Sequence, residues 1–423
     1  MPAPVNGSAG YNNEHAPLLG SRPDTSSSSR HRRDWKHLPQ HVASLTWATL
    51  ASNYVNVLLV FVPIGIVAGA LHWNPTAVFI LNFIAIIPLA SLLSFATEEI
   101  SAKLGQTLGG LMNATFGNAV ELIVSIVALR DGEIRIVQSS MLGSILSNIL
   151  LVLGCCFLAG GIHRREQEFN STVASTMSSL MAVASASLII PATLYAALKD
   201  SKAETDDGIM LLSHGTSIIL LILYLLYLYF QLFSHHDLFN DVEAQNPEDE
   251  EEHILSPVAA GIALVVTTII VAVCADFLVG SIDSIVETAH ISKTFIGLVL
   301  IPIVGNAAEH VTAVIVAYKG KMDLAINVAI GSSMQIALFV TPFLVILGWI
   351  IDQPMTLHFQ GFETVVFFLS VLVVNYLIQD GKSNYLEGAM CLGTYTIIAL
   401  AFYVYPDDAK GDLSGSFLKN FFH

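Results

Sequence analysis

Charge and cysteine are both scarce in this sequence. Only 12% of its 423 residues are charged and 54% are hydrophobic, whereas a soluble domain carries about 25% charged residues. The four cysteines lie in apolar stretches and form no CxxC pair, so neither a disulfide framework nor a zinc site is predicted. The net charge of −16 argues against nucleic acid as a partner. An HExxH pair is also missing, which argues against an intramembrane metalloenzyme.

No apolar segment of the signal-peptide type follows the initiator methionine. Residues 1–50 are polar and are predicted to form a disordered tail. A basic cluster at 30–36 precedes the first apolar run, and such clusters favour the cytosolic side of a membrane. Within the tail, Glu14, Leu18 and Leu19 resemble an acidic dileucine signal that sorting adaptors read. We therefore expect a vacuolar or lysosome-like membrane, with the N-terminus in the cytosol.

Long apolar runs occupy most of the remaining sequence. A membrane-spanning helix needs about 20 apolar residues, and the predicted fold is an all-α polytopic membrane protein with about eleven transmembrane helices. This count places the loop with Arg164 and Arg165 in the cytosol and the loop with Arg130 and Arg135 on the opposite side. The runs lie near 54–71, 77–99, 104–129, 139–160, 173–198, 209–233, 255–282, 294–318, 324–350, 357–378 and 385–405.

An internal repeat organises these runs. The motif Gly117-Asn118-Ala119-Val120-Glu121 recurs 188 positions later as Gly305-Asn306-Ala307-Ala308-Glu309. The same offset pairs Glu99 with Glu287 and Gly143-Ser144 with Gly331-Ser332. Each half has five spans, an odd number, so the halves should have opposite orientations in the membrane. The predicted parts are an extra first helix at 51–75, a first repeat at 76–234, an acidic cytosolic segment at 235–253, a second, inverted repeat at 254–405 and a luminal tail at 406–423.

The repeated motif carries an acid at membrane depth. Glu121 and Glu309 lie inside apolar spans, where an ionisable side chain indicates function. Each lies three residues after an asparagine and shares its helix face. Carboxylate, amide and carbonyl oxygens are the ligands that Ca²⁺ prefers. Without metal, two close carboxylates should hold protons near neutral pH, so cation and protons would displace each other. The alternative is a pair of buried Asn–Glu hydrogen bonds that only hold helices together.

Other polar residues are candidates for the same site. The residues that would complete a ligand shell, or form ordinary interhelical hydrogen bonds, are Ser144, Ser147, Asn148, Ser332 and Gln335. Backbone groups at an opened helix would come from Gly117, Ala119, Gly305 and Ala307. His310 is either a proton-handling neighbour of Glu309 or a packed histidine. For Glu99 and Glu287, the gate, pathway and solvated helix-end interpretations all stay open.

A dense acidic segment separates the two halves. It would either concentrate or sense Ca²⁺ near the cytosolic entrance or serve as a solvated linker. Its acidic residues are Asp241, Glu243, Glu248, Asp249, Glu250, Glu251 and Glu252.

Together, the two Gly-Asn-Ala-x-Glu motifs and Gly331-Ser332-Ser333-Met334-Gln335 resemble those of the calcium/proton exchangers, a branch of the cation/calcium antiporter superfamily. The resemblance covers residues 50–405 and is greatest to the fungal vacuolar members. It implies a secondary transporter, not an enzyme, that exchanges cytosolic Ca²⁺ for luminal H⁺ across the vacuolar membrane without a bound cofactor. By analogy, Glu121 and Glu309 would bind the ion and carry protons, assisted by Asn306 and Gln335. The alternatives are exchange of Mn²⁺ or of several divalent cations for H⁺ and, from another class, a Ca²⁺ channel.

Overall fold

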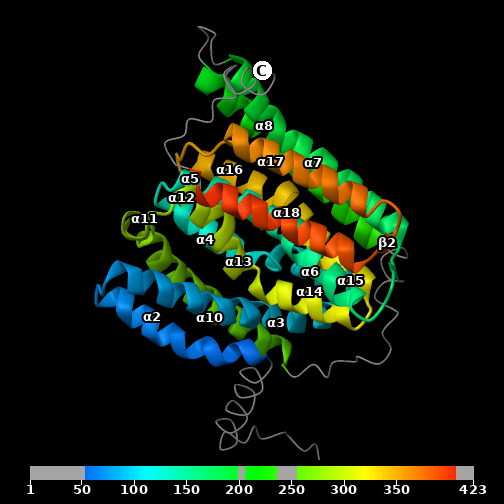
Figure 1. The fold of residues 1–423 in the computed structure, drawn as a ribbon. Coiled ribbons are helices and arrows are strands. Elements are labelled where there is room, and N and C mark those ends of the chain that lie inside the picture. The colour runs from blue at the N-terminus through cyan, green and yellow to red at the C-terminus, as the bar shows by residue number, and fades with distance from the viewer. Residues whose placement is uncertain (1–52, 199–204, 236–254, 406–423) are drawn as a thin grey trace, which may run out of the picture. The chain divides into compact units, whose positions relative to one another are not determined.

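The described part of the chain is almost wholly helical. The structure, a computed structural model, describes residues 53–198, 205–235 and 255–405 (Figure 1). Two short strands, β1 (Gln167–Glu168) and β2 (Lys382–Ser383), pair antiparallel. The helices of the first half are η1 (Tyr54–Val60), α2 (Phe61–Ala70), α3 (Pro75–Phe116), α4 (Ala119–Arg130), α5 (Ile134–Leu146), η2 (Ser147–Val152), α6 (Leu153–Gly161), α7 (Ser171–Leu198), α8 (Thr205–Tyr229) and η3 (Phe230–Ser234).

The second half follows a similar order of elements. Its helices are α10 (Pro257–Gly280), α11 (Ile282–Ala289), α12 (Lys293–Phe295), η4 (Ile296–Leu300), α13 (Ile301–Gly305), α14 (Ala307–Tyr318), α15 (Met322–Gln335), η5 (Ile336–Val340), α16 (Thr341–Ile350), α17 (Gly361–Leu377) and α18 (Tyr385–Tyr403).

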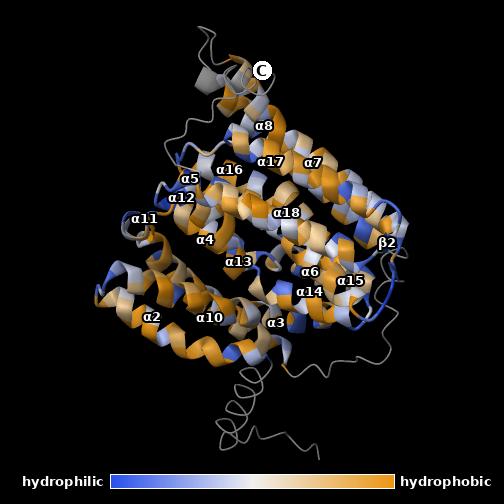
Figure 2. Cartoon of the chain, viewed as in Figure 1, coloured by the Kyte–Doolittle hydropathy of each residue, from blue (hydrophilic) through white to orange (hydrophobic). Residues whose placement is uncertain are grey.

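The predicted all-α membrane fold is confirmed, but the count of eleven spans is not. Seven helices in the described residues are long and apolar enough to cross a membrane, and an eighth is added if Ile282–Ala289 and Lys293–Gly305, bent by 118°, count as one span. Three shorter apolar helices lie at Tyr54–Ala70, Ala307–Tyr318 and Gly361–Leu377. Figure 2 shows hydrophobic residues along most helices and hydrophilic residues concentrated in the connections. Breaks at the two motifs and two helices of only 17 residues thus explain why apolar runs outnumber long spans.

Helix α3 turns back on itself near its middle. Its membrane-spanning part is Pro75–Leu104. A Cβ added at Gly109 would lie 2.2 Å from the Ser101 carbonyl oxygen, although eight residues of straight helix span about 12 Å. The chain therefore reverses direction between these residues, and Gly109 permits the close backbone approach. This reversal falls where the sequence predicts the break between its second and third spans.

Helix boundaries in the two halves follow the offset of the sequence repeat. Helices α4 and α14 begin 188 positions apart, at Ala119 and Ala307, and also end 188 apart. Helices α5 and α15 begin at Ile134 and Met322, again 188 apart, and each continues into a π-helical turn. Gly132 and Gly320, which precede them, have positive φ angles of 80° and 88°. The repeated residues therefore adopt the same local structure in both halves.

Loops from both halves meet at each end of these helices. We call the first end the Arg135 face, formed by residues 131–135, 290–294 and 353–363. Two contacts join the halves at this face. Lys293 Nζ is 2.9 Å from Glu133 Oε2, and Gln138 Nε2 donates to the Thr356 carbonyl at 3.0 Å. The second is the Arg164 face, formed by residues 162–170, 319–323 and 378–384.

The Arg164 face has contacts of its own between the halves. Here β1 pairs with β2, the Asn170 backbone N–H donates to Asp323 Oδ1 at 2.6 Å and Arg164 Nη1 donates to the Gly320 carbonyl at 3.3 Å. Loops of the two halves are thus joined at both ends of the helices that carry the repeated motifs.

Candidate cation-binding site

Both repeated motifs lie where a helix is interrupted. After α3 ends at Phe116, the chain makes a turn at Gly117 and Asn118 before α4 begins. In the second half, α13 ends at Gly305 and Asn306 forms the turn before α14. The interruptions fall at the predicted positions, and Ala119 and Ala307 are the first residues of the new helices. Each acid occupies the first turn of its helix, where the helix dipole favours a negative charge.

The two motifs contact each other. A Cβ added at Gly305 would lie 2.9 Å from Glu121 Oε1, so the absence of a side chain at this position makes room for the carboxylate of the other half. Glu121 and Glu309 are also close enough to interact electrostatically. The structure therefore brings together the two acids that the sequence repeat paired.

A chain of hydrogen bonds joins the predicted polar residues across the halves. Asn118 Nδ2 donates to Gln335 Oε1 at 2.7 Å, and the Ser332 hydroxyl donates to Asn118 Oδ1 at 2.8 Å. Asn148 Nδ2 donates to Ser332 Oγ at 3.1 Å, and the Ser332 hydroxyl also interacts with Glu309. These residues come from four interrupted helices, so the network fixes their positions relative to one another.

Several buried polar atoms in this region have no hydrogen-bond partner among the described residues. They are Glu121 Oε1, Glu309 Oε2, Ser144 Oγ and both side-chain polar atoms of Asn306. A buried polar atom without a partner costs about 1–3 kcal/mol, so such a cluster calls for a ligand, a proton or water. Carboxylate, amide and hydroxyl oxygens match the donor set of a hard divalent cation. The unpaired oxygens therefore fit an oxygen-coordinated ion, whereas Asn306 Nδ2 is a donor that would need another partner.

The surroundings of the two acids differ. Glu121 is buried and faces a small cavity with walls that are otherwise apolar, including Phe83, Ile86 and Leu278. Glu309 is only partly buried, and the exposed Glu98 of α3 acts on it electrostatically. An ionised Glu121 would lack compensation on its apolar side. Glu309 is thus more exposed as a residue than Glu121, although its Oε2 atom is buried.

Packing around the site is asymmetric between the repeats. Added Cβ atoms at Gly143 and Gly297 would lie 2.1 Å from the Leu298 carbonyl oxygen and 1.9 Å from Ser139 Oγ. Helices α5 and η4 therefore pack in direct backbone contact. The repeat mate of Gly143 is Gly331. The nearest atom to a Cβ added at Gly331 would be Met177 Cε, at 3.7 Å. The tight contact toward the Arg135 face has no counterpart toward the Arg164 face in these residues.

The remaining predicted residues lie in different environments. Ser147 Oγ is 3.4 Å from His310 Nε2, which links this histidine to η2. Glu99 is buried and accepts a hydrogen bond from the Leu255 backbone N–H at 3.0 Å, ahead of α10. Its mate Glu287 is exposed on α11, so the pair does not share a role by geometry. The acidic residues from Asp241 to Glu252 lie outside the described residues.

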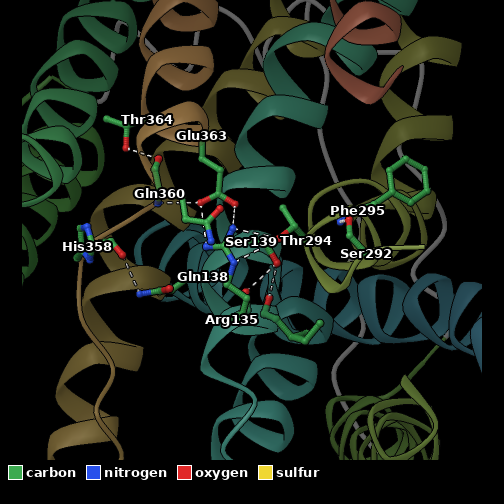
Figure 3. A network of polar contacts seen from close by, with 11 residues as sticks. Arg135, Gln138, Ser139, Ser292, Thr294, Phe295, His358, Gln360, Glu363 and Thr364 are labelled. Atoms are coloured by element: carbon green, nitrogen blue, oxygen red, sulfur yellow. Dashed lines mark hydrogen bonds and ion pairs between the residues drawn. The ribbon is translucent and has the colours of Figure 1, made fainter. Parts of the chain in front are cut away.

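Two features escape the sequence prediction. Glu98, not Glu99, acts electrostatically on Glu309; its repeat mate is Val286, so the repeat gives no signal for it. The second feature is a network at the Arg135 face, in which Arg135 forms an ion pair with Glu363 and hydrogen-bonds to Thr294 (Figure 3). Glu363 is fully buried at the start of α17. A charged residue predicted inside an apolar run could have indicated this buried pair.

The fold and site define a multi-span membrane protein with a buried, oxygen-rich site shared by two repeated halves. The chain belongs to the sodium/calcium exchanger protein family, whose model matches residues 74–233 and 259–404. This finding confirms the superfamily to which the sequence motifs pointed.

Relatives cover most of the chain. It is 54% identical to a vacuolar calcium ion transporter of Schizosaccharomyces pombe, over 93% of each chain. It is 44% identical to a Ca²⁺/H⁺ antiporter of Aphanothece halophytica, over 82% of this chain and 96% of the relative. The solved structure of native YfkE matches with a TM-score of 0.71 and 37% identity, covering 83% of this chain and 100% of that one. The resemblance to calcium/proton exchangers and to fungal vacuolar members is therefore confirmed.

Proposed function

We propose that this protein is a secondary active antiporter, not an enzyme, that exchanges cytosolic Ca²⁺ for luminal H⁺ across the vacuolar membrane. The observation that carries the proposal is the set of unpaired buried atoms on Glu121, Glu309 and Asn306 at the contact of the two motifs. Relatives described as a vacuolar calcium ion transporter and as Ca²⁺/H⁺ antiporters support the choice of ions. Ca²⁺ is the transported substrate in this proposal, and no resident cofactor is required.

The two acids would bind Ca²⁺ and protons in turn. Ca²⁺ needs ionised carboxylates, whereas the empty site is too poor in compensating groups to keep two adjacent charges. Asn306, the partly buried Gln335 and the hydroxyls of Ser144 and Ser332 would supply further oxygens. Each ion then displaces the other, and the coupling of the two fluxes follows from this competition.

Access to the site would alternate between the two faces. The tight α5–η4 contact closes the route toward the Arg135 face, while Glu309 is partly exposed. With a cytosolic N-terminus, the order of spans makes the Arg135 face luminal and the Arg164 face cytosolic. The two inverted repeats would exchange their packing to open the luminal side. Sorting adaptors that read Glu14, Leu18 and Leu19 would direct the protein to the vacuole.

The deciding experiment is uptake of ⁴⁵Ca²⁺ into proteoliposomes with an imposed pH gradient, acidic inside. Loss of a charged ligand costs about 1.5–3 kcal/mol, which is at least about tenfold in affinity. Glu121→Gln and Glu309→Gln should therefore each lower gradient-driven uptake by about tenfold or more. Glu168→Gln, an equivalent change at an exposed acid on β1, is the matched control and should transport like the wild type.

Two outcomes would favour the alternatives. Full gradient-driven uptake by both glutamine variants would remove the acids from the mechanism. Uptake that persists after the pH gradient is collapsed would indicate a channel. Competition with Mn²⁺ in the same assay measures whether the site, which offers oxygen ligands to both ions, serves calcium alone.

A further inference from the structure

A cavity of about 480 Å³ opens at the Arg164 face, where α6 ends and α18 begins. These two helices pack with their backbones in contact, since a Cβ added at Gly161 would lie 2.6 Å from the Tyr385 backbone nitrogen. The cavity lies beyond this contact, away from the two motifs. Its lining residues are Leu158, Gly161, Ile162, His163, Arg164, Arg165 and Tyr385.

No acid among the described residues pairs with the cationic side of this cavity. Neither Arg164 nor Arg165 forms an ion pair with another described residue, and the only bond from Arg164 is to the Gly320 carbonyl at 3.3 Å. The nearby acids Glu166 and Glu168 instead pair with Lys382, each at 3.4 Å. A guanidinium offers five N–H donors in a fork that matches phosphate oxygens. Two adjacent arginines therefore leave most of their donors free for an anion.

The other side of the cavity is apolar and lies at the level of the membrane boundary. Helix α6 is the end of the span Ile134–Gly161, and α18 is the start of the span Tyr385–Tyr403. Ile162 is 63% exposed and Tyr385 is 59% exposed, which is unfavourable in water but suits the acyl and interfacial region of a bilayer. A basic pocket beside apolar helix ends is a known way of holding a lipid headgroup. A soluble phosphate would use the arginines but would leave these apolar side chains uncovered.

We propose that this cavity binds the phosphate headgroup of an anionic phospholipid, with Arg164 and Arg165 holding the phosphate and Ile162 and Tyr385 contacting the adjoining glycerol and acyl region. His163 lies in the same lining and is 3.1 Å from the Tyr318 hydroxyl at the end of α14. A bound headgroup would therefore connect α6, α18 and α14. The site does not depend on which ion the protein transports.

The test uses the full chain purified in detergent and follows its thermal unfolding during titration with three probes. Dioctanoyl phosphatidic acid provides the phosphate and the chains, dioctanoyl phosphatidylcholine the chains with a zwitterionic headgroup, and inorganic phosphate the anion alone. We expect only phosphatidic acid to raise the unfolding temperature. Arg165→Gln, which removes an exposed side chain without a partner, should raise the half-saturating concentration about fivefold. Lys103→Gln, the same charge change outside the cavity, should leave it unchanged.

Each other outcome overturns the proposal. If Arg165→Gln binds phosphatidic acid as the wild type does, the arginines do not hold the headgroup. If inorganic phosphate gives the same arginine-dependent stabilisation, the ligand is a soluble anion and not a lipid. If phosphatidylcholine stabilises equally, the effect comes from the chains alone. Arg164→Gln with Arg165→Gln gives a larger expected loss, and the single variant keeps the test valid should the double variant unfold.

Discussion

At the scale of single residues, the two motif asparagines are chemically alike but differently placed. Asn118 is held by Gln335 and Ser332 through hydrogen bonds, whereas the polar atoms of Asn306 have no partner in the described residues. The sequence repeat makes these residues equivalent, and nothing in the motif itself distinguishes them. Their difference comes from the helix that follows each motif. At the repeat position where the second half has Gln335, in α15, the first half has Ser147, in η2. We infer that Asn118 organises the site and that Asn306 is free to bind.

This difference predicts that alanine substitution affects stability at one asparagine and Ca²⁺ uptake at the other. Asn118→Ala removes the hydrogen bonds to Gln335 and Ser332, leaves Gln335 Oε1 without its Asn118 donor, and should lower the free energy of unfolding by about 1–3 kcal/mol. Asn306→Ala breaks no hydrogen bond and should leave the unfolding temperature of the cation-free protein close to that of the wild type. It should nevertheless raise the Ca²⁺ concentration needed for half-maximal ⁴⁵Ca²⁺ uptake. Equal destabilisation by both variants would show that Asn306 is a structural residue.

Site residues could be predicted from the sequence only where the repeat marked them. Glu121, Glu309 and Asn118 carry the repeat signal, and Gln335 follows Gly331-Ser332 in the segment that the repeat matches, although its own mate is Ser147. The structure brings these residues together. Glu98 has Val286 as its repeat mate and Arg135 has Asp323, so the repeat gives no signal for the neighbour of Glu309 or for the ion pair with Glu363. Such residues break the symmetry of the halves, and only their three-dimensional neighbours identify them.

At the scale of helices, small residues let α5 pack against η4, and an ion pair with the buried Glu363 joins α5 to α17. Gly143 and Gly297 allow the helices to touch, and Arg135 fastens the end of α5 to Glu363 and Thr294 (Figure 3). The helix interruptions at the two motifs were predictable, because glycine and asparagine together favour an opened helix. The ion pair was not predictable, because Arg135 and Glu363 lie 228 positions apart in the chain.

Removing one member of this ion pair should be more harmful than removing both. Arg135→Gln leaves the fully buried Glu363 carboxylate without its cation, and breaking a buried pair in this way costs about 3–5 kcal/mol. Glu363→Gln leaves Arg135, whose side chain is 23% exposed, so solvent screening makes the loss smaller. The double variant should recover part of the stability lost in Arg135→Gln. Thermal unfolding of the four proteins measures this cycle, and additive losses would show that the pair is not coupled.

At the scale of the whole molecule, the repeat predicts two equivalent halves, while the structure shows them in unequal packing. In the proposed exchange, one sequence must serve both an outward-open and an inward-open state, so the sequence cannot specify which contact is closed. The predicted number of spans is not confirmed for a related reason. The predicted runs at 104–129 and 294–318 each contain a helix interruption, at Gly117-Asn118 and at Asn306, so neither run is one long helix. These irregularities lie beside the site, where a transporter needs backbone groups and movement.

The proposed exchange makes the stability of the whole protein depend jointly on Ca²⁺ and pH. A ligand that binds only the folded state stabilises it by about 2.7 kcal/mol at one hundred times its Kd. Because Ca²⁺ requires the ionised forms of Glu121 and Glu309, protons compete with it, and its apparent Kd should rise as the pH falls. The rise reaches about tenfold per pH unit for each proton displaced. Stabilisation by Ca²⁺ should therefore be present at neutral and higher pH and fade in acid.

Thermal unfolding in detergent at a fixed Ca²⁺ concentration and several pH values measures this linkage without any membrane gradient. Glu121→Gln removes one competing carboxylate, so its weaker Ca²⁺ stabilisation should also vary less steeply with pH. An apparent Kd for Ca²⁺ that is constant with pH in the wild type would contradict competition at one site, even if proteoliposomes took up Ca²⁺ against a proton gradient. In that case the two ions would have to be coupled through separate sites on the two halves, and the contact between the Glu121 carboxylate and Gly305 would have a structural role only.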